Sequence, residues 1–154
     1  MSEWKRSTSE VPFENLRTEM VEGIKKHVEQ YNLGSILGEA LMCVQTDSEK
    51  IKKSLFGGPE RVYMGVVLTP RWLLWAVSEP KSQMTVLSAQ LKDIVAQDYS
   101  QTQLAKLVSD SGIEVSGRLT DTTENVSAFI GLDEGEAANR FKEQVITAAQ
   151  EAKK

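Results

Sequence analysis

Residues 61–77, RVYMGVVLTPRWLLWAV, indicate the fold more clearly than any other part of the chain. The stretch holds two apolar runs, residues 62–68 and 72–77, separated by Thr69, Pro70 and Arg71. Both runs are rich in β-branched and aromatic side chains, which suit a pleated, buried surface, and each is too short to cross a bilayer. Because proline cannot continue a central β-ladder, the pattern predicts a β-hairpin in the core of an all-β or α+β domain.

The composition is typical of one globular domain. The chain has 154 residues, of which 40% are hydrophobic and 26% are charged, and a chain of that size buries roughly 70% of its extended surface. The net charge of −4 does not attract nucleic acid through the overall field, so we expect no nucleic-acid partner. The first ten residues lack the apolar core of a signal peptide, and no stretch is long enough to span a membrane. The sequence therefore predicts a cytoplasmic protein.

The N-terminal third is expected to hold a tail and a helix. Residues 1–10 are polar and without pattern, so we expect a disordered tail. Residues 11–33 predict a helix, because apolar residues recur at spacings of three and four. That stripe consists of Phe13, Leu16, Met20, Ile24, His27 or Val28, and Tyr31. It needs a partner, which is either the body of the domain or another copy of the protein.

The remaining segments read as strands followed by one helix. The expected strands are residues 39–46, 83–90, 94–95, 113–120 and 125–132, with a polar connection over 47–58. Residues 100–109 fit a short helix or a strand, and the capping spacing favours the helix. A last amphipathic helix is expected to begin at Asp133 as its N-cap and to present Phe141, Val145, Ala148 or Ala149, and Ala152 on one face.

Two passages resemble the pleckstrin-homology-like superfamily, in particular its bacterial and GRAM-like members. Residues 63–76, YMGVVLTPRWLLWA, look like the GRAM-type hairpin, and residues 129–145, FIGLDEGEAANRFKEQV, look like a last strand running into the capping helix. The resemblance implies a mainly β, α+β fold over residues 36–154. This would be a partly open barrel of about seven antiparallel strands capped by a C-terminal helix. The N-terminal helix lies outside the family pattern.

One basic segment is a candidate contact for lipid headgroups or other anions. It consists of Lys50, Lys52 and Lys53, to which Arg61 and Arg71 could add charge. In lipid-binding members of the resembled superfamily, basic residues in this loop hold inositol phosphates. Here acidic residues surround the segment, and the second basic residue of the family pattern after Arg61 is missing. A solvated charged loop is therefore the favoured interpretation, and peripheral membrane contact is the alternative.

No motif for catalysis or for a cofactor is present in the sequence. The one cysteine, Cys43, has apolar neighbours and is expected to be buried and inert. The one histidine, His27, is expected at the surface or at the edge of the helix stripe. A zinc site needs more histidine or cysteine ligands, and no nucleophile elbow or phosphate loop occurs. We therefore expect no enzyme activity, no metal and no cofactor.

The sequence is best interpreted as a non-catalytic binding or interaction module. An unknown protein partner or a second copy of the chain is the expected ligand. The candidate interaction surface consists of Phe13, Leu16, Met20, Ile24, Tyr31 and Trp72. Trp72 and Trp75 are three residues apart and so fall on opposite faces of a strand, with core packing expected for one of them. Weak binding of anionic lipid is the first alternative, and a ligand-cavity protein or an enzyme is the second.

Overall fold

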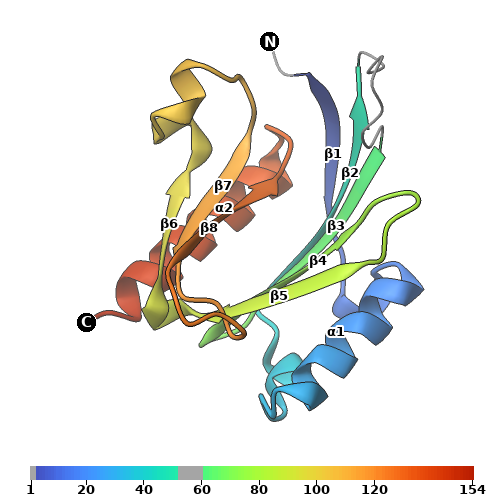
Figure 1. Cartoon of the computed structure of the whole chain (residues 1–154), viewed down its shortest axis with the longest axis vertical. Coiled ribbons are helices and arrows are strands. Elements are labelled where there is room, and N and C mark those ends of the chain that lie inside the picture. Colours follow the sequence, from blue (N-terminus) through green and yellow to red (C-terminus); the bar gives the residue numbers. More distant parts are fainter. Residues whose placement is uncertain (1–2, 52–60) are drawn as a thin grey trace.

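The computed structural model describes residues 3–51 and 61–154, in which eight strands and two α-helices are found. The fold is mainly β and of the α+β class, with two antiparallel sheets and a C-terminal helix (Figure 1). The first sheet holds β1 (Trp4–Glu10), β2 (Met42–Lys50), β3 (Arg61–Leu68), β4 (Trp72–Ser78) and β5 (Thr85–Gln90). The second holds β6 (Ile94–Asp98), β7 (Gly112–Gly117) and β8 (Val126–Gly131). The helices are α1 (Thr18–Gln30) and α2 (Glu136–Glu151).

The hairpin predicted from residues 61–77 is confirmed as β3 and β4. Val66 lies opposite Trp75 and Leu68 opposite Leu73 in an antiparallel ladder. The turn is closed by Thr69, whose main-chain N–H donates to the carbonyl oxygen of Trp72 at 2.9 Å, and whose hydroxyl accepts from the N–H of Trp72 at 3.0 Å. Pro70 therefore sits outside the ladder, where its missing N–H removes no bond.

Side chains of the five-stranded sheet alternate between two separate cores. Leu73 and Trp75 point to the inner core, between the two sheets and α2, whereas Leu74 and Ala76 point to the outer core under α1. A strand with both faces covered reads as a continuous apolar run, which explains the sequence WLLWAV. Trp75 is in the inner core and Trp72 packs against the outer one, so the prediction of opposite faces is confirmed.

The predicted N-terminal helix is interrupted near its start. A 3₁₀ turn spans Phe13–Asn15, and Leu16 and Arg17 then adopt extended ψ angles of 164° and 139° before α1 begins at Thr18. The main-chain N–H of Arg17 donates to the side-chain oxygen of Gln45 at 3.0 Å, which fixes this break against β2. The apolar stripe nevertheless faces one way, and it is buried on the outer face of the five-stranded sheet. The partner of the stripe is therefore the domain itself.

The expectation of a disordered tail over residues 1–10 is wrong, because Trp4–Glu10 form the edge strand β1. Trp4 lies opposite Lys50 and Glu10 opposite Val44, so β1 pairs with β2 along its whole length. Side-chain bonds add to the ladder: the N–H of Thr8 donates to Asp133 at 2.8 Å. The first strand expected from the sequence, residues 39–46, is displaced to Met42–Lys50, because β1 and β3 pair with both of its edges.

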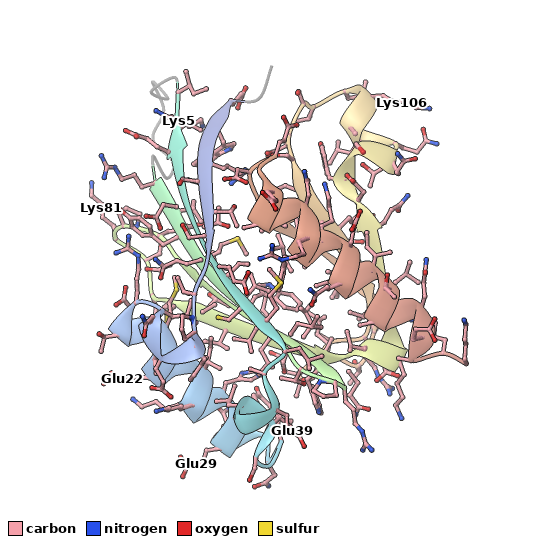
Figure 2. All side chains as sticks on the ribbon, turned by 180° about the vertical axis from the view of Figure 1, so that it is seen from behind. Lys5, Glu22, Glu29, Glu39, Lys81 and Lys106 are labelled. Atoms are coloured by element: carbon pink, nitrogen blue, oxygen red, sulfur yellow. The ribbon has the colours of Figure 1, made fainter. Side chains whose placement is uncertain are left out.

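The C-terminal helix is confirmed, but its start differs from the prediction. Helix α2 begins at Glu136 with Gly135 as the capping residue, whereas the carboxylate of Asp133 accepts the N–H groups of Thr8 and Gly135, both at 2.8 Å. Asp133 therefore joins β1 to the entrance of α2. The face carrying Phe141 and Val145 is fully buried in the inner core. Figure 2 shows the molecule from the side opposite to Figure 1. In this view α2 lies beside the three-stranded sheet, and β1 and β2 face it.

Candidate interaction surface

Exposed apolar side chains gather on the part of the chain that carries the three-stranded sheet. Among the described residues, eight large hydrophobic side chains are exposed, and six of these belong to residues 94–131. Four of the six form what we call the apolar surface: Leu104, Leu107, Val108 and Phe129. Tyr99 joins them through its ring contact with Phe129 and its bond to Val108. The other two are Val95 in β6, which lies opposite Ser116, and Val126 at the start of β8.

The apolar surface includes the connection between β6 and β7, which is held in a fixed shape. Two 3₁₀ turns, Tyr99–Gln101 and Leu104–Lys106, replace the short helix expected over residues 100–109. The hydroxyl of Tyr99 donates to the carbonyl oxygen of Val108 at 2.6 Å, and its ring meets Phe129 edge-on at 5.1 Å. Leu107 is 86% exposed on this framework. The connection therefore presents its aliphatic side chains without having to fold on binding.

An ion pair between β1 and the segment that precedes β7 supports the same region. The guanidinium of Arg6 in β1 donates two bonds to the carboxylate of Asp110, at 3.0 and 2.8 Å, and a third to the hydroxyl of Ser48 at 2.6 Å. It also lies 5.5 Å from the centre of the Phe129 ring. The side chains of Arg6 and Asp110 are only 9% and 13% exposed. This clasp joins the edge of the five-stranded sheet to the segment that precedes β7.

The interaction surface expected from the sequence is wrong in most of its members. Phe13, Leu16, Met20 and Ile24 are buried under α1 in the outer core and are not available to a partner. Tyr31 and Trp72 are half-buried and line a groove at the other end of the molecule. The exposed residues include Leu104 and Leu107. These two are three residues apart, which is also the spacing of side chains on the buried face of a helix.

Among the described basic residues proposed for anion binding, Lys50 and Arg61 lie at one end of β3 and Arg71 lies at the other. Lys50 ends β2, and Arg61 begins β3 with its guanidinium 3.6 Å from the carboxylate of Glu49. Arg71 lies in the turn at the opposite end of β3, about 23 Å away along the strand. Lys52 and Lys53 lie outside the described residues. Arg71 therefore cannot share a headgroup with Lys50 or Arg61.

The one cysteine and the one histidine of the chain are both buried. Burial raises the pKa of the Cys43 thiol to about 12, as expected for an inert cysteine. His27 is buried rather than at the surface, and its Nε2 lies 2.7 Å from the hydroxyl of Ser88. Burial lowers the pKa of His27, and Asp121 opposes that shift. Ser88 is itself 1% exposed, so a substrate could not reach this serine–histidine pair.

Neither a metal cluster nor a membrane-spanning helix occurs in residues 3–51 and 61–154. The histidine, cysteine and acidic side chains there do not gather in threes around a possible ion. Neither α-helix combines the length with the apolar character needed to cross a bilayer. No protein-family model matches the chain, and no curated protein or solved structure is significantly similar to it.

Proposed function

We propose that this chain is a non-catalytic protein-interaction module that binds its partner through the apolar surface. The observation that carries the proposal is the concentration of exposed aliphatic and aromatic side chains on the rigid β6–β8 unit, with Leu107 at 86% exposure. Scattered surface hydrophobes are ordinary, whereas a gathered set marks a binding region.

Charge and rigidity favour a protein partner. Lys106 is the one charged residue between Tyr99 and Ser109, and depletion of charge is typical of the centre of a protein interface. The hydrogen bonds of Tyr99 hold the connection in place before binding, so less conformational entropy is lost on association. Phe129 adds an aromatic side chain, the type that contributes most at interfaces.

We also propose that the architecture is pleckstrin-homology-like. Strands β2–β5 and β6–β8 would correspond to the seven strands of the partly open barrel, and α2 to its capping helix. On this interpretation β1 and α1 are additions. They cover one edge and the outer face of the first sheet, which leaves the three-stranded sheet as the uncovered side. A cytoplasmic location remains a prediction.

The test compares two leucine side chains that are both exposed. Leu107→Asp places a charge in the apolar surface, and Leu41→Asp is the matched control, because Leu41 is 60% exposed outside it. Burial of a leucine is worth about 1.5–3 kcal/mol, so Leu107→Asp should weaken partner binding by roughly 10- to 100-fold. Sedimentation equilibrium measures self-association, and affinity capture from native extract followed by titration measures binding of another protein. Equal effects of the two variants would refute the proposal.

Anionic lipid is a second candidate ligand of the same region. Leu104, Leu107 and Val108 flank Lys106, and no carboxylate interrupts residues 99–109. An aliphatic segment with a cation suits the boundary of an anionic bilayer. Co-sedimentation with phosphatidylserine and phosphatidylcholine vesicles separates the candidates. If the unmodified chain binds either type of vesicle and Leu107→Asp does not, lipid is favoured as the ligand. If the unmodified chain binds neither type, protein is favoured as the ligand.

A further inference from the structure

A groove at the end of the molecule opposite the start of β1 is built from three parts of the chain. Its volume is about 530 Å³, which lies within the range of small-ligand sites. Tyr31 and Asn32 come from the end of α1; Trp72, Gln90 and Asp93 come from the five-stranded sheet and the turn that follows it. Arg118 and Thr120 come from the connection between β7 and β8. In Figure 1 this connection lies below β8, near the last part of β5.

Buried hydrogen bonds fix the walls of the groove. The hydroxyl of Ser88 lies 2.7 Å from Nε2 of His27 and 2.5 Å from the hydroxyl of Thr120. The main-chain N–H of Thr120 donates to the carbonyl oxygen of Ser88 at 2.9 Å. One chain of bonds therefore ties α1, β5 and the β7–β8 connection together. The ring of Tyr31 packs on His27 with centroids 4.7 Å apart.

The four amide and charged side chains that line the groove have no polar partner in the part of the chain that the structure describes. They are the amides of Asn32 and Gln90, the carboxylate of Asp93 and the guanidinium of Arg118. Asp93 and Arg118 are neighbours across the β6–β7 ladder, because Ile94 pairs with Gly117. Their charged groups nevertheless form no ion pair, although exposed pairs occur elsewhere on the surface. The groove thus offers both signs of charge and two amides to a ligand.

We propose that this groove binds a small zwitterionic ligand of the amino-acid or short-peptide class with free termini. The guanidinium of Arg118 suits a carboxylate, which it can grip with two parallel bonds. The carboxylate of Asp93 accepts from an ammonium group. The amides of Asn32 and Gln90 can donate to and accept from a peptide unit, and Trp72 and Tyr31 supply apolar walls. A purely anionic ligand would be repelled by Asp93, and a purely cationic one by Arg118.

The experiment uses trialanine and two capped forms, N-acetyl-trialanine and trialanine amide, with the full chain. Binding is measured by titration with ¹H–¹⁵N spectra, in which the amides of residues 118–123 should shift and saturate. Trialanine should bind with a Kd between micromolar and millimolar, and each capped form at least tenfold more weakly. This site does not depend on the apolar surface, so Leu107→Asp should leave the titration unchanged.

Two variants assign the ends of the peptide. Arg118→Gln should weaken trialanine at least tenfold and remove its advantage over the amide, while the advantage over the acetylated form persists. Asp93→Asn should also weaken trialanine at least tenfold. It should remove the advantage of trialanine over the acetylated form, while the advantage over the amide persists. Lys106→Gln is the control, because it removes a cation outside the groove. The proposal is overturned if no peptide causes saturable shifts, if capping has no effect, or if Arg118→Gln and Lys106→Gln behave alike in a protein whose spectrum is otherwise native.

Discussion

The clasp between Arg6 and Asp110 should contribute far more to stability than an exposed ion pair of the same chemistry. Both side chains are largely enclosed, at 9% and 13% exposure, and three bonds from the guanidinium satisfy them. Removing one partner of a buried pair costs about 3–5 kcal/mol. Asp110 keeps a bond from the N–H of Ser111 at 2.8 Å, so we expect about 2–3 kcal/mol for Arg6→Met. For a chain of this size that corresponds to a Tm lower by about 4–12 °C.

A double-mutant cycle isolates the pair from the packing of the arginine stem. Arg6→Met, Asp110→Asn and the double variant are unfolded in urea and followed by circular dichroism and tryptophan fluorescence. The loss in free energy of unfolding in the double variant should be about 1.5–3 kcal/mol smaller than the two single losses added together. This difference is the value of hydrogen bonds that involve charged groups. The pair Arg140–Glu10, at 48% and 45% exposure, is the control and should couple by less than about 1 kcal/mol. Equal coupling in the two pairs would refute the reasoning.

Three further predictions follow from buried groups and tight backbone. Gly117→Ala should destabilise the fold by about 3 kcal/mol or more. The reason is that Gly117 has a φ of 145° and that a Cβ there would meet the carbonyl oxygen of Asp93. Gly38→Ala is the control and should change the unfolding midpoint little, because a Cβ at Gly38 meets nothing within 4 Å. The Cys43 thiol, with its pKa raised to about 12, should react with iodoacetamide in native protein only at the rate of unfolding, and fast native labelling would contradict its burial. The pKa of His27 is lowered from 6.5, so the unfolded state binds more protons below that pH and the free energy of unfolding should fall as pH drops below about 6.5. A His27→Gln variant should lose this part of the pH dependence, and an unchanged profile would show that His27 does not cause it.

The sequence predicted the elements whose pattern is set by burial. The hairpin of β3 and β4 and the opposite faces of Trp72 and Trp75 follow from alternation with a period of two, and these features are confirmed. Helix α2 was predicted for a similar reason, since Phe141 and Val145 are one turn apart and both are buried. Apolar periodicity indicates such elements because one face must leave water.

Elements held by polar contacts were not predicted. Strand β1 has the sequence WKRSTSE, and it is ordered by its backbone ladder and by bonds of Arg6 and Thr8 to residues more than 100 positions away. The break before α1 was missed because Phe13 and Leu16 continue the apolar stripe across it. The pairing of His27 with Ser88 depends on two elements meeting in space, and sequence spacing carries no sign of that.

The candidate sites were hidden for two different reasons. Leu104 and Leu107 have the spacing of a buried helical face, and a single sequence does not show that the 3₁₀ turns leave them in solvent. The groove draws residues from three distant segments. Such a site cannot be recognised from a pattern along the chain, because only the folded sheets bring Trp72 and Arg118 to its walls.

The most direct test of the apolar surface is site-specific photo-crosslinking in native extract. A photoreactive phenylalanine analogue is placed at position 107 in one sample and at position 41 in another. We predict one dominant crosslinked protein, either a partner or a second copy of the chain, from position 107 and not from position 41. The same products at both positions, or none at position 107, would contradict the interaction surface assigned to the β6–β8 unit.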